Sequence, residues 1–181
     1  MTEGPIARWS LARRRQQAAR DEEFTEFVTA TAHGLRRTAY LLCRDWHLAQ
    51  DLTQTALARM YASWGRVRRS GNLNAYSRRV LMNAIFDQRK RRSSGEVVVA
   101  ELPESAARPR EATVEVHVTL MRALATLPIR DQAIVVLRYW EDHSVETVAE
   151  ILDVSASVVT TQSARALTRL RALLGEEFIW T

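Results

Sequence analysis

The fold is decided by LRYWEDHSVETVAEILDVSASVVTTQSARAL, residues 137–167, because this stretch predicts two short helices separated by a tight turn. Ser144 and Ser155 are suited to cap the two helices, since a serine hydroxyl accepts hydrogen bonds from the free amides of a first helical turn. Asp153 stands at the turn, where Asp tolerates the left-handed conformation better than most side chains. The segment is therefore interpreted as a helix-turn-helix, although a plain antiparallel helix pair fits the same pattern.

Helical spacing predicts which face of each helix is buried. The expected inward positions are Val145, Val148, Ile151, Leu152, Val154, Val158, Val159, Leu167 and Leu170. The opposite face of the second helix presents polar side chains of kinds that contact base edges and phosphates. These side chains are Ser157, Thr160, Thr161, Gln162 and Arg165.

The composition predicts a soluble, mostly helical chain. Its 181 residues are enough for one medium domain or two small ones, and 46% are hydrophobic. No apolar run approaches the roughly 20 residues that cross a bilayer. Cys43 is the only cysteine and the N-terminus lacks a signal-like apolar core, so the cytoplasm is the expected compartment. The four histidines lack metal-ligand spacing and no phosphate-binding glycine loop is present, so no catalytic residue, metal or cofactor is predicted.

Positive charge is concentrated in one part of the chain. The net charge is +5, but residues 59–92 contain ten basic residues and one acid, a local net charge of +9. A block of this kind predicts a polyanionic partner, and guanidinium groups bind phosphate well.

Periodicity predicts an all-α fold of two small helical domains joined by an extended linker. Helices are expected over residues 21–44, 47–64, 75–92, 114–127 and 129–139, before the two of the helix-turn-helix. Asn74 is the expected cap of the third helix. The predicted segments are a weakly ordered basic arm at 1–20, a first domain at 21–93, a linker at 94–113, a second domain at 114–175 and a tail at 176–181.

Four motifs in this order resemble those of the extracytoplasmic-function (ECF, group 4) sigma factors, members of the sigma-70 family of bacterial RNA polymerase. AQDLTQTAL at 49–57 is similar to the helix that docks on the polymerase clamp, and NAYSRRVLMNAIFDQRKRR at 74–92 is similar to the promoter-melting and minus-ten helix. LPIRDQAIVVLRY at 127–139 is similar to the segment that leads into the minus-thirty-five helix-turn-helix. The spacing of Gln162, Arg165 and Leu167 resembles the spacing found in an actinobacterial, sigma-E-like branch of this family.

The resemblance implies a factor that binds core RNA polymerase, directs it to specific promoters and promotes DNA melting. It implies contacts with the clamp of the β′ subunit through Asp51, Leu52, Gln54 and Leu57. The implied minus-ten contacts are Arg68, Arg69, Asn72, Asn74, Tyr76, Arg78, Arg79, Asn83, Asp87, Arg89, Lys90, Arg91 and Arg92. The implied minus-thirty-five contacts are Arg130, Arg138, Ser157, Thr160, Thr161, Gln162, Arg165 and Arg169. The flap of the β subunit is a second expected contact, an anti-sigma factor is a further candidate partner, and no membrane is expected.

Several of these assignments have alternatives. The loop at residues 66–74 is expected to hold a flipped minus-ten base, but a solvated basic loop fits the same residues. Trp64 and Tyr76 are suited to base stacking or to core packing, and core packing is favoured for Trp64. The linker carries Glu96, Glu101, Glu104 and Glu111, which in the polymerase interior would imitate nucleic acid; a plain spacer is the alternative. The rival functions are a stand-alone regulator that binds operator DNA as a dimer, and an interaction module that uses the arginine surface on another protein.

Overall fold

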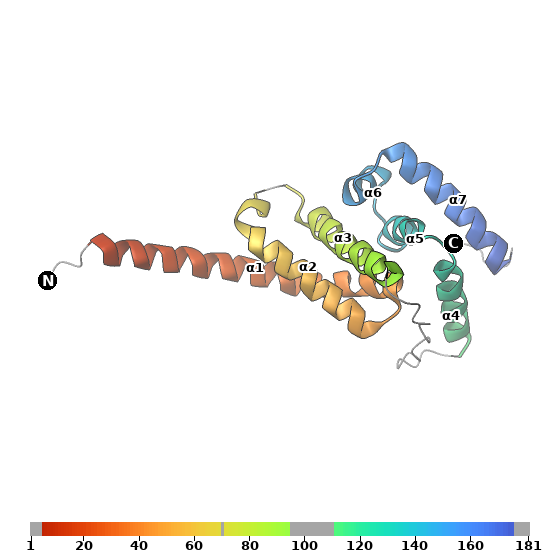
Figure 1. The fold of residues 1–181 in the computed structure, drawn as a ribbon, viewed down its shortest axis with the longest axis horizontal. Helices are drawn as coiled ribbons and strands as arrows, with labels where there is room; N and C mark the ends of the chain where they lie inside the picture. Colours follow the sequence, from red (N-terminus) through yellow and green to blue (C-terminus); the bar gives the residue numbers. More distant parts are fainter. Residues whose placement is uncertain (1–4, 70, 95–110, 176–181) are drawn as a thin grey trace.

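The computed structural model describes residues 5–69, 71–94 and 111–175. This part of the chain contains helices and no strand, which confirms the all-α prediction (Figure 1). The first unit consists of α1 (Pro5–Cys43), α2 (Trp46–Val67) and α3 (Leu73–Ser94). The second unit consists of α4 (Glu111–Ala125), α5 (Ile129–Val135), η1 (Val136–Trp140), α6 (Val145–Leu152) and α7 (Ala156–Leu174).

The first unit packs α2 between α1 and α3 around an apolar core. Leu42, Met60 and Leu81, one from each helix, are fully buried. At the far end of α2, Trp64 lies against two rings of α1, with centroids 5.1 Å from Phe24 and 5.3 Å from Phe27. Aromatic pairs at this separation stabilise beyond their area burial. The favoured core role of Trp64 is therefore confirmed, since only 2% of its surface is exposed.

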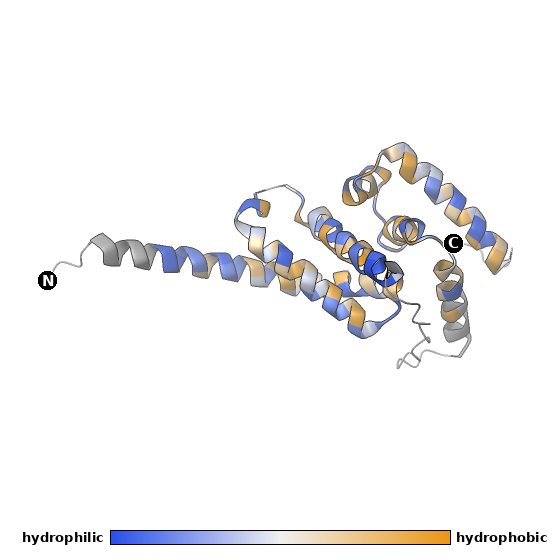
Figure 2. Cartoon of the chain, viewed as in Figure 1, coloured by the Kyte–Doolittle hydropathy of each residue, from blue (hydrophilic) through white to orange (hydrophobic). Residues whose placement is uncertain are grey.

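Several helix boundaries differ from the sequence-based expectations. The first helix begins at Pro5 rather than near residue 21, so the described part of the predicted weakly ordered arm is helical. It extends well beyond the other helices of the unit, and its residues 13–20 are mostly hydrophilic (Figures 1 and 2). The second helix continues through Gly65 to Val67, because a glycine near a helix end is only mildly unfavourable.

The cap of α3 also differs from the prediction. The Asn72 side chain, not that of Asn74, accepts the hydrogen bond from the Ala75 amide, at 3.0 Å. α3 and α4 reach into the predicted linker by one and three residues, at Ser94 and from Glu111. The acidic linker residues Glu96, Glu101 and Glu104 lie outside the described residues.

The helix-turn-helix forms as its capping residues predict. Ser144 accepts from the Thr147 amide at 3.1 Å, and Ser155 accepts from the Val158 amide at 3.4 Å. Asp153 adopts the left-handed conformation, with φ 57° and ψ 49°. The preceding helix ends in a π turn, in which the Glu141 amide donates to the Val136 carbonyl at 3.0 Å.

The buried face of α7 is partly different from the predicted one. Val159 and Leu170 are buried as expected, but Val158 is 36% exposed. The inner positions between them are taken by Ser163 and Ala166. A helical period that starts at 159 reaches 163, 166 and 170, which turns position 158 outward.

The two units pack against each other. Their buried apolar residues form one continuous cluster, and α3 lies against α6. At another point of the seam, the Arg44 guanidinium at the end of α1 donates to the Met121 carbonyl of α4 at 3.3 Å. The structure therefore shows a closed arrangement, which places groups from both units at a shared seam.

Candidate nucleic-acid and polymerase interface

The predicted clamp-docking residues divide into an exposed pair and a buried part. Asp51 and Gln54 are exposed on the same side of α2, and neither has a bonded partner among the described residues. Leu52 is 5% exposed and belongs to the core, because the helical period turns it inward with Ala49 and Ala56. Leu57 is half-buried. The surface available to a docking partner is thus the one that carries Asp51 and Gln54.

A pocket lies beside the loop that was expected to hold a flipped base. It has a volume of about 540 Å³ and is lined by Glu23, Glu26, Phe27, Trp64, Arg68, Arg69 and Leu73. The Arg68 guanidinium pairs with Glu23 at 2.5 Å, and both side chains are largely exposed. The Asn72 amide oxygen is engaged as the cap of α3, so this side chain has less capacity for a base. Tyr76 is half-buried against the Trp64 cluster.

Sequence reasoning missed the two carboxylates of this pocket. Glu23 and Glu26 come from α1, and Glu23 lies 45 residues before the arginine that it contacts. Nothing in their local sequence distinguishes them from other exposed acids on a helix.

The predicted strand-binding face of α3 has two parts. Asn83 is exposed. The C-terminal end of α3 is also exposed and carries Arg89, Lys90, Arg91 and Arg92. Asp87 pairs with Arg59 of α2 at 3.5 Å. Arg78 and Arg79, in contrast, are turned toward the second unit.

Glu141 is the centre of the polar contacts at the seam. Its carboxylate accepts hydrogen bonds from the Arg78 Nε and from the Thr38 hydroxyl. His143 Nε2 lies 3.3 Å from the same carboxylate, whose side chain is 9% exposed. A second ion pair joins Arg79 to Asp153 at 3.2 Å, and the Arg130 guanidinium lies 5.3 Å from the Phe86 ring centroid. Thr38 and Glu141 were not predicted as functional residues.

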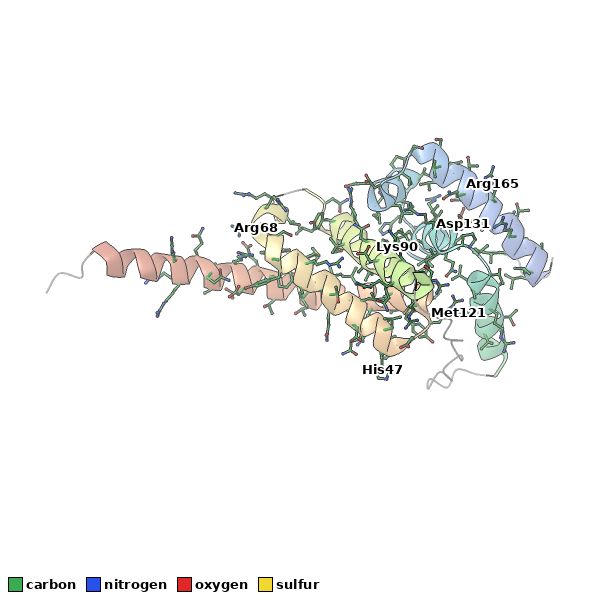
Figure 3. The ribbon with its side chains drawn as sticks, viewed as in Figure 1. His47, Arg68, Lys90, Met121, Asp131 and Arg165 are labelled. Atoms are coloured by element: carbon green, nitrogen blue, oxygen red, sulfur yellow. The ribbon has the colours of Figure 1, made fainter. Side chains whose placement is uncertain are left out.

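The outer face of α7 agrees with the expected exposure at every position except Gln162. Ser157, Thr160, Thr161 and Arg165 are exposed, and Gln162 is half-buried. Arg169 is 61% exposed, with its guanidinium 4.0 Å from Asp131. Figure 3 places Arg165 on α7 and Arg68 at the end of α2 well apart, so the two surfaces would meet separate parts of a long ligand.

Arg138 has a local role in the structure. Its guanidinium donates to the His143 carbonyl and lies 5.6 Å from the centroid of the Tyr139 ring. It thereby holds the turn that precedes α6. At the start of α6, backbone hydrogen bonding lowers the pKa of Glu146, as expected for a carboxylate in a first helical turn.

Neither a metal site nor a membrane span is found in the part of the chain that the structure describes. Residues 5–69, 71–94 and 111–175 contain no group of three or more His, Cys, Asp or Glu side chains that could hold a metal ion. No helix within the same residues is long and apolar enough to cross a membrane.

The chain has a basic helical unit with a pocket beside its loop, and this unit packs against a helix-turn-helix unit. This combination is typical of a DNA-binding transcription protein with two DNA-contacting parts. Comparison with known families identifies it further. Residues 27–95 match Sigma-70 region 2, and residues 117–170 match Sigma-70, region 4. The chain belongs to the ECF sigma factors of the sigma-70 family. It is therefore a transcription initiation factor that binds core RNA polymerase, directs it to specific promoters and promotes DNA melting.

Individual relatives agree with this assignment. The chain is 40% identical over 152 residues to the RNA polymerase sigma-E factor of Streptomyces coelicolor, covering 82% of this chain and 84% of the relative. It is 30% identical over 141 residues to the ECF RNA polymerase sigma factor SigM of Mycobacterium tuberculosis, covering 78% of this chain and 71% of the relative. The fold is similar to that of the sigma factor RpoE from Bartonella quintana, solved in complex with the anti-sigma factor NepR. The TM-score is 0.68 at 22% identity, over 84% of this chain and 97% of that one.

Proposed function

We propose that the chain divides promoter recognition between its two units. The loop pocket and α3 would bind the nontemplate strand at the minus-ten element, and the outer face of α7 would read the minus-thirty-five duplex. The observation that carries this proposal is the pocket of about 540 Å³ beside the predicted loop, whose walls combine aromatic and arginine side chains with the carboxylates of Glu23 and Glu26. It is large enough to admit an unstacked base, and aromatic and cationic groups are the usual partners of single-stranded nucleic acid.

The polymerase would be gripped at two places. The exposed Asp51 and Gln54 of α2 would meet the clamp of the β′ subunit, with Leu52 supporting this surface from the core. The flap of the β subunit would dock on the second unit, where a groove of about 360 Å³ runs between η1 and α7. Apolar side chains such as Val145 and Leu167 line this groove, and Arg138 and Arg171 border it.

Further parts of the proposal concern partners and location. The similar solved fold from Bartonella quintana is a sigma factor in complex with the anti-sigma factor NepR, which supports an anti-sigma factor as a partner of this chain. The cytoplasm, where core polymerase and promoter DNA are found, is the proposed compartment. The chain would supply recognition and strand stabilisation, with the polymerase making the bonds.

The proposal is tested by comparing core binding with unaided DNA binding. The full chain should co-purify with core polymerase and barely shift duplex promoter DNA alone, whereas a dimeric operator-binding regulator would shift DNA unaided. With core polymerase bound, Arg68→Ala with Arg69→Ala should reduce permanganate reactivity of unpaired minus-ten thymines. Arg37→Ala with Arg122→Ala, which removes two exposed arginines of α1 and α4, serves as the charge-matched control. Full strand opening by the pocket variant would refute the pocket assignment.

A further inference from the structure

Positive charge is concentrated in the N-terminal extension of α1, residues 5–20, as well as in the block at residues 59–92. The extension contains five arginines and no acid, which equals the net charge of +5 of the whole chain. The rest of the chain is therefore neutral overall. The extension precedes residues 27–95, which match Sigma-70 region 2, so that match assigns it no role.

Three arginines of the extension are free to bind a partner. Arg13, Arg14 and Arg15 are exposed, and none of them has a bonded partner among the described residues. Because an α-helix has 3.6 residues per turn, these three consecutive positions spread over about 200° of the helix surface. Such a spread suits a partner that surrounds the helix better than a flat surface that meets one side of it.

The extension is fixed at its base by Tyr61 of α2. The Gln17 amide donates to the Tyr61 hydroxyl at 3.0 Å, and this hydroxyl donates to Asp21 at 2.6 Å. The Arg20 guanidinium donates to the Tyr61 carbonyl at 2.6 Å and lies 5.2 Å from the ring centroid. Because α1 is one continuous helix, these contacts set the direction in which the extension leaves the first unit.

The extension leads away from the loop pocket on the side opposite to the helix-turn-helix (Figure 1). Glu23 lines the pocket, and Arg13 precedes it by ten residues. This separation is about 15 Å along the helix axis, which spans about four base pairs of duplex DNA. With the minus-thirty-five duplex on α7 and the minus-ten strand at the pocket, the extension points toward the DNA downstream of the minus-ten element.

Charge changes sign where the extension joins the body of the first unit. Residues 21–26 contain four acids and no base. Two of these acids are engaged, since Glu23 pairs with Arg68 and Asp21 accepts from Tyr61. The other two, Glu22 and Glu26, are exposed and repel phosphate. A duplex held by the extension therefore makes its contacts before residue 21.

The extension has the dimensions and the surface of a helix that lies in a DNA groove. A helix is about 10–12 Å wide, and the major groove of B-DNA is about 12 Å wide. A helix in this groove lies between the phosphates of both strands, which arginine binds through charge-assisted hydrogen bonds. Residues 13–19 read RRRQQAA and so lack the apolar stripe with which a helix packs on a protein.

We propose that the N-terminal extension of α1 lies in the major groove of the duplex directly downstream of the minus-ten element, where Arg13, Arg14 and Arg15 bind phosphates of both strands. This inference rests on the proposed place of the minus-ten strand at the loop pocket. The extension adds affinity without reading sequence, because phosphate contacts are the same on every promoter.

Cross-linking from the extension provides the first test. Gln16→Cys, an exposed position next to the arginines, carries a thiol-linked photo-cross-linker in a Cys43→Ser background of the full holoenzyme. It should form adducts with promoter DNA within about 10 base pairs, one helical turn, downstream of the minus-ten element. The same label at the exposed Ala30→Cys of α1 is the control site and should form no such adduct. Adducts of Gln16→Cys with polymerase subunits alone, or with other parts of the promoter, would overturn the inference.

Binding of holoenzyme to two promoter fragments provides the second test. One fragment continues downstream, and the other ends at the downstream edge of the minus-ten element. On the long fragment, Arg13→Gln with Arg15→Gln should weaken binding by about 2- to 30-fold and reduce the slope of log K against log salt by about 1.8, for two duplex phosphates. On the short fragment this variant should equal the parent. Equal losses on both fragments, or no loss on the long one, would refute the groove contact.

Two controls separate charge from helix stability and from net charge. Arg13→Lys with Arg15→Lys keeps both positive charges and should keep the salt slope of the parent, since this slope counts neutralised phosphates. Arg37→Gln with Arg122→Gln removes two exposed arginines elsewhere and should also leave the slope unchanged. A slope lowered equally by either control would contradict phosphate binding by the extension.

Failure of the proposed function is recognised separately. In that case Arg68→Ala with Arg69→Ala would leave strand opening intact, whatever the extension binds. If the same variant impairs opening while Gln16→Cys gives no downstream adduct, only the inference about the extension is refuted.

Discussion

Arg165 and Arg169 of α7 allow a base-reading contact to be separated from a phosphate contact. They lie four residues apart, so they occupy neighbouring turns on one side of the helix. Arg165 is exposed and has no bonded partner in the described structure. Arg169 is 61% exposed, and its guanidinium is 4.0 Å from Asp131. Replacing either by Ala should therefore leave the free fold almost unchanged and act on promoter binding.

The two substitutions should affect promoter binding in different ways, one depending on the DNA sequence and the other on salt. A bidentate arginine–guanine contact discriminates by about 1–3 kcal/mol, so Arg165→Ala should weaken binding of a cognate minus-thirty-five element by roughly 5- to 150-fold. It should weaken binding of a substituted element much less. Arg169→Ala should weaken binding to both elements equally and reduce the slope of log K against log salt by about 0.9, the value for one duplex phosphate.

The assay is closed-complex formation by reconstituted holoenzyme on two promoter fragments that differ only in the minus-thirty-five element, at several salt concentrations. Arg122→Ala of α4 is the matched control, because it is exposed and lies outside the predicted DNA surfaces. An equal loss on both fragments for Arg165→Ala, with a reduced salt slope, would show that Arg165 contacts phosphate. No loss for either variant would show that this face of α7 does not meet the promoter.

Four other outcomes are expected. Asp51→Arg with Gln54→Ala should weaken core-polymerase binding in a titration and leave the circular dichroism spectrum unchanged; an unaltered affinity would exclude this face as the clamp contact. Asn83→Ala should spare closed complexes and reduce permanganate reactivity of minus-ten thymines, and an equal loss of both would contradict a role limited to the open strand. Asp153→Gly should be more stable than Asp153→Ala by about 1 kcal/mol in urea unfolding, because only Ala bears a Cβ in the left-handed region; equal stabilities would contradict this reason. Burial raises the pKa of the Cys43 thiol, so iodoacetamide should alkylate this thiol more slowly than a free cysteine at pH 8. The rate of alkylation should rise at higher pH, and in denaturant it should equal that of a free cysteine; an equal rate already in the native chain would contradict the burial.

Features set by short-range physics could be predicted from the sequence. The caps at Ser144 and Ser155 and the left-handed Asp153 follow from local hydrogen bonding and backbone preference, and the structure confirms all three. Boundary errors arose where local preferences compete. Both Asn72 and Asn74 are suitable caps for α3, and the choice depends on where the chain leaves α2.

Features that depend on tertiary contacts could not be predicted in the same way. Leu52 belongs to a motif associated with docking, but its place in the helical period makes it a core residue. Glu23 and Glu141 became part of the candidate surfaces only because folding brings them to arginines 45 and 63 residues away in the sequence. A motif gives the residue types of a site, and the packing decides which of them face outward.

The same reasoning changes the meaning of the basic block at residues 59–92. Counted along the sequence, it has a net charge of +9. In the folded chain it receives three carboxylates from outside, those of Glu23, Glu141 and Asp153, which lowers the net charge of the folded surface to +6. Two of these three come from the second unit, so opening the seam returns most of the lost charge to the face that is proposed to bind DNA. The attraction of this surface for nucleic acid therefore depends on how the two units are arranged, and sequence composition alone overstates it for the closed chain.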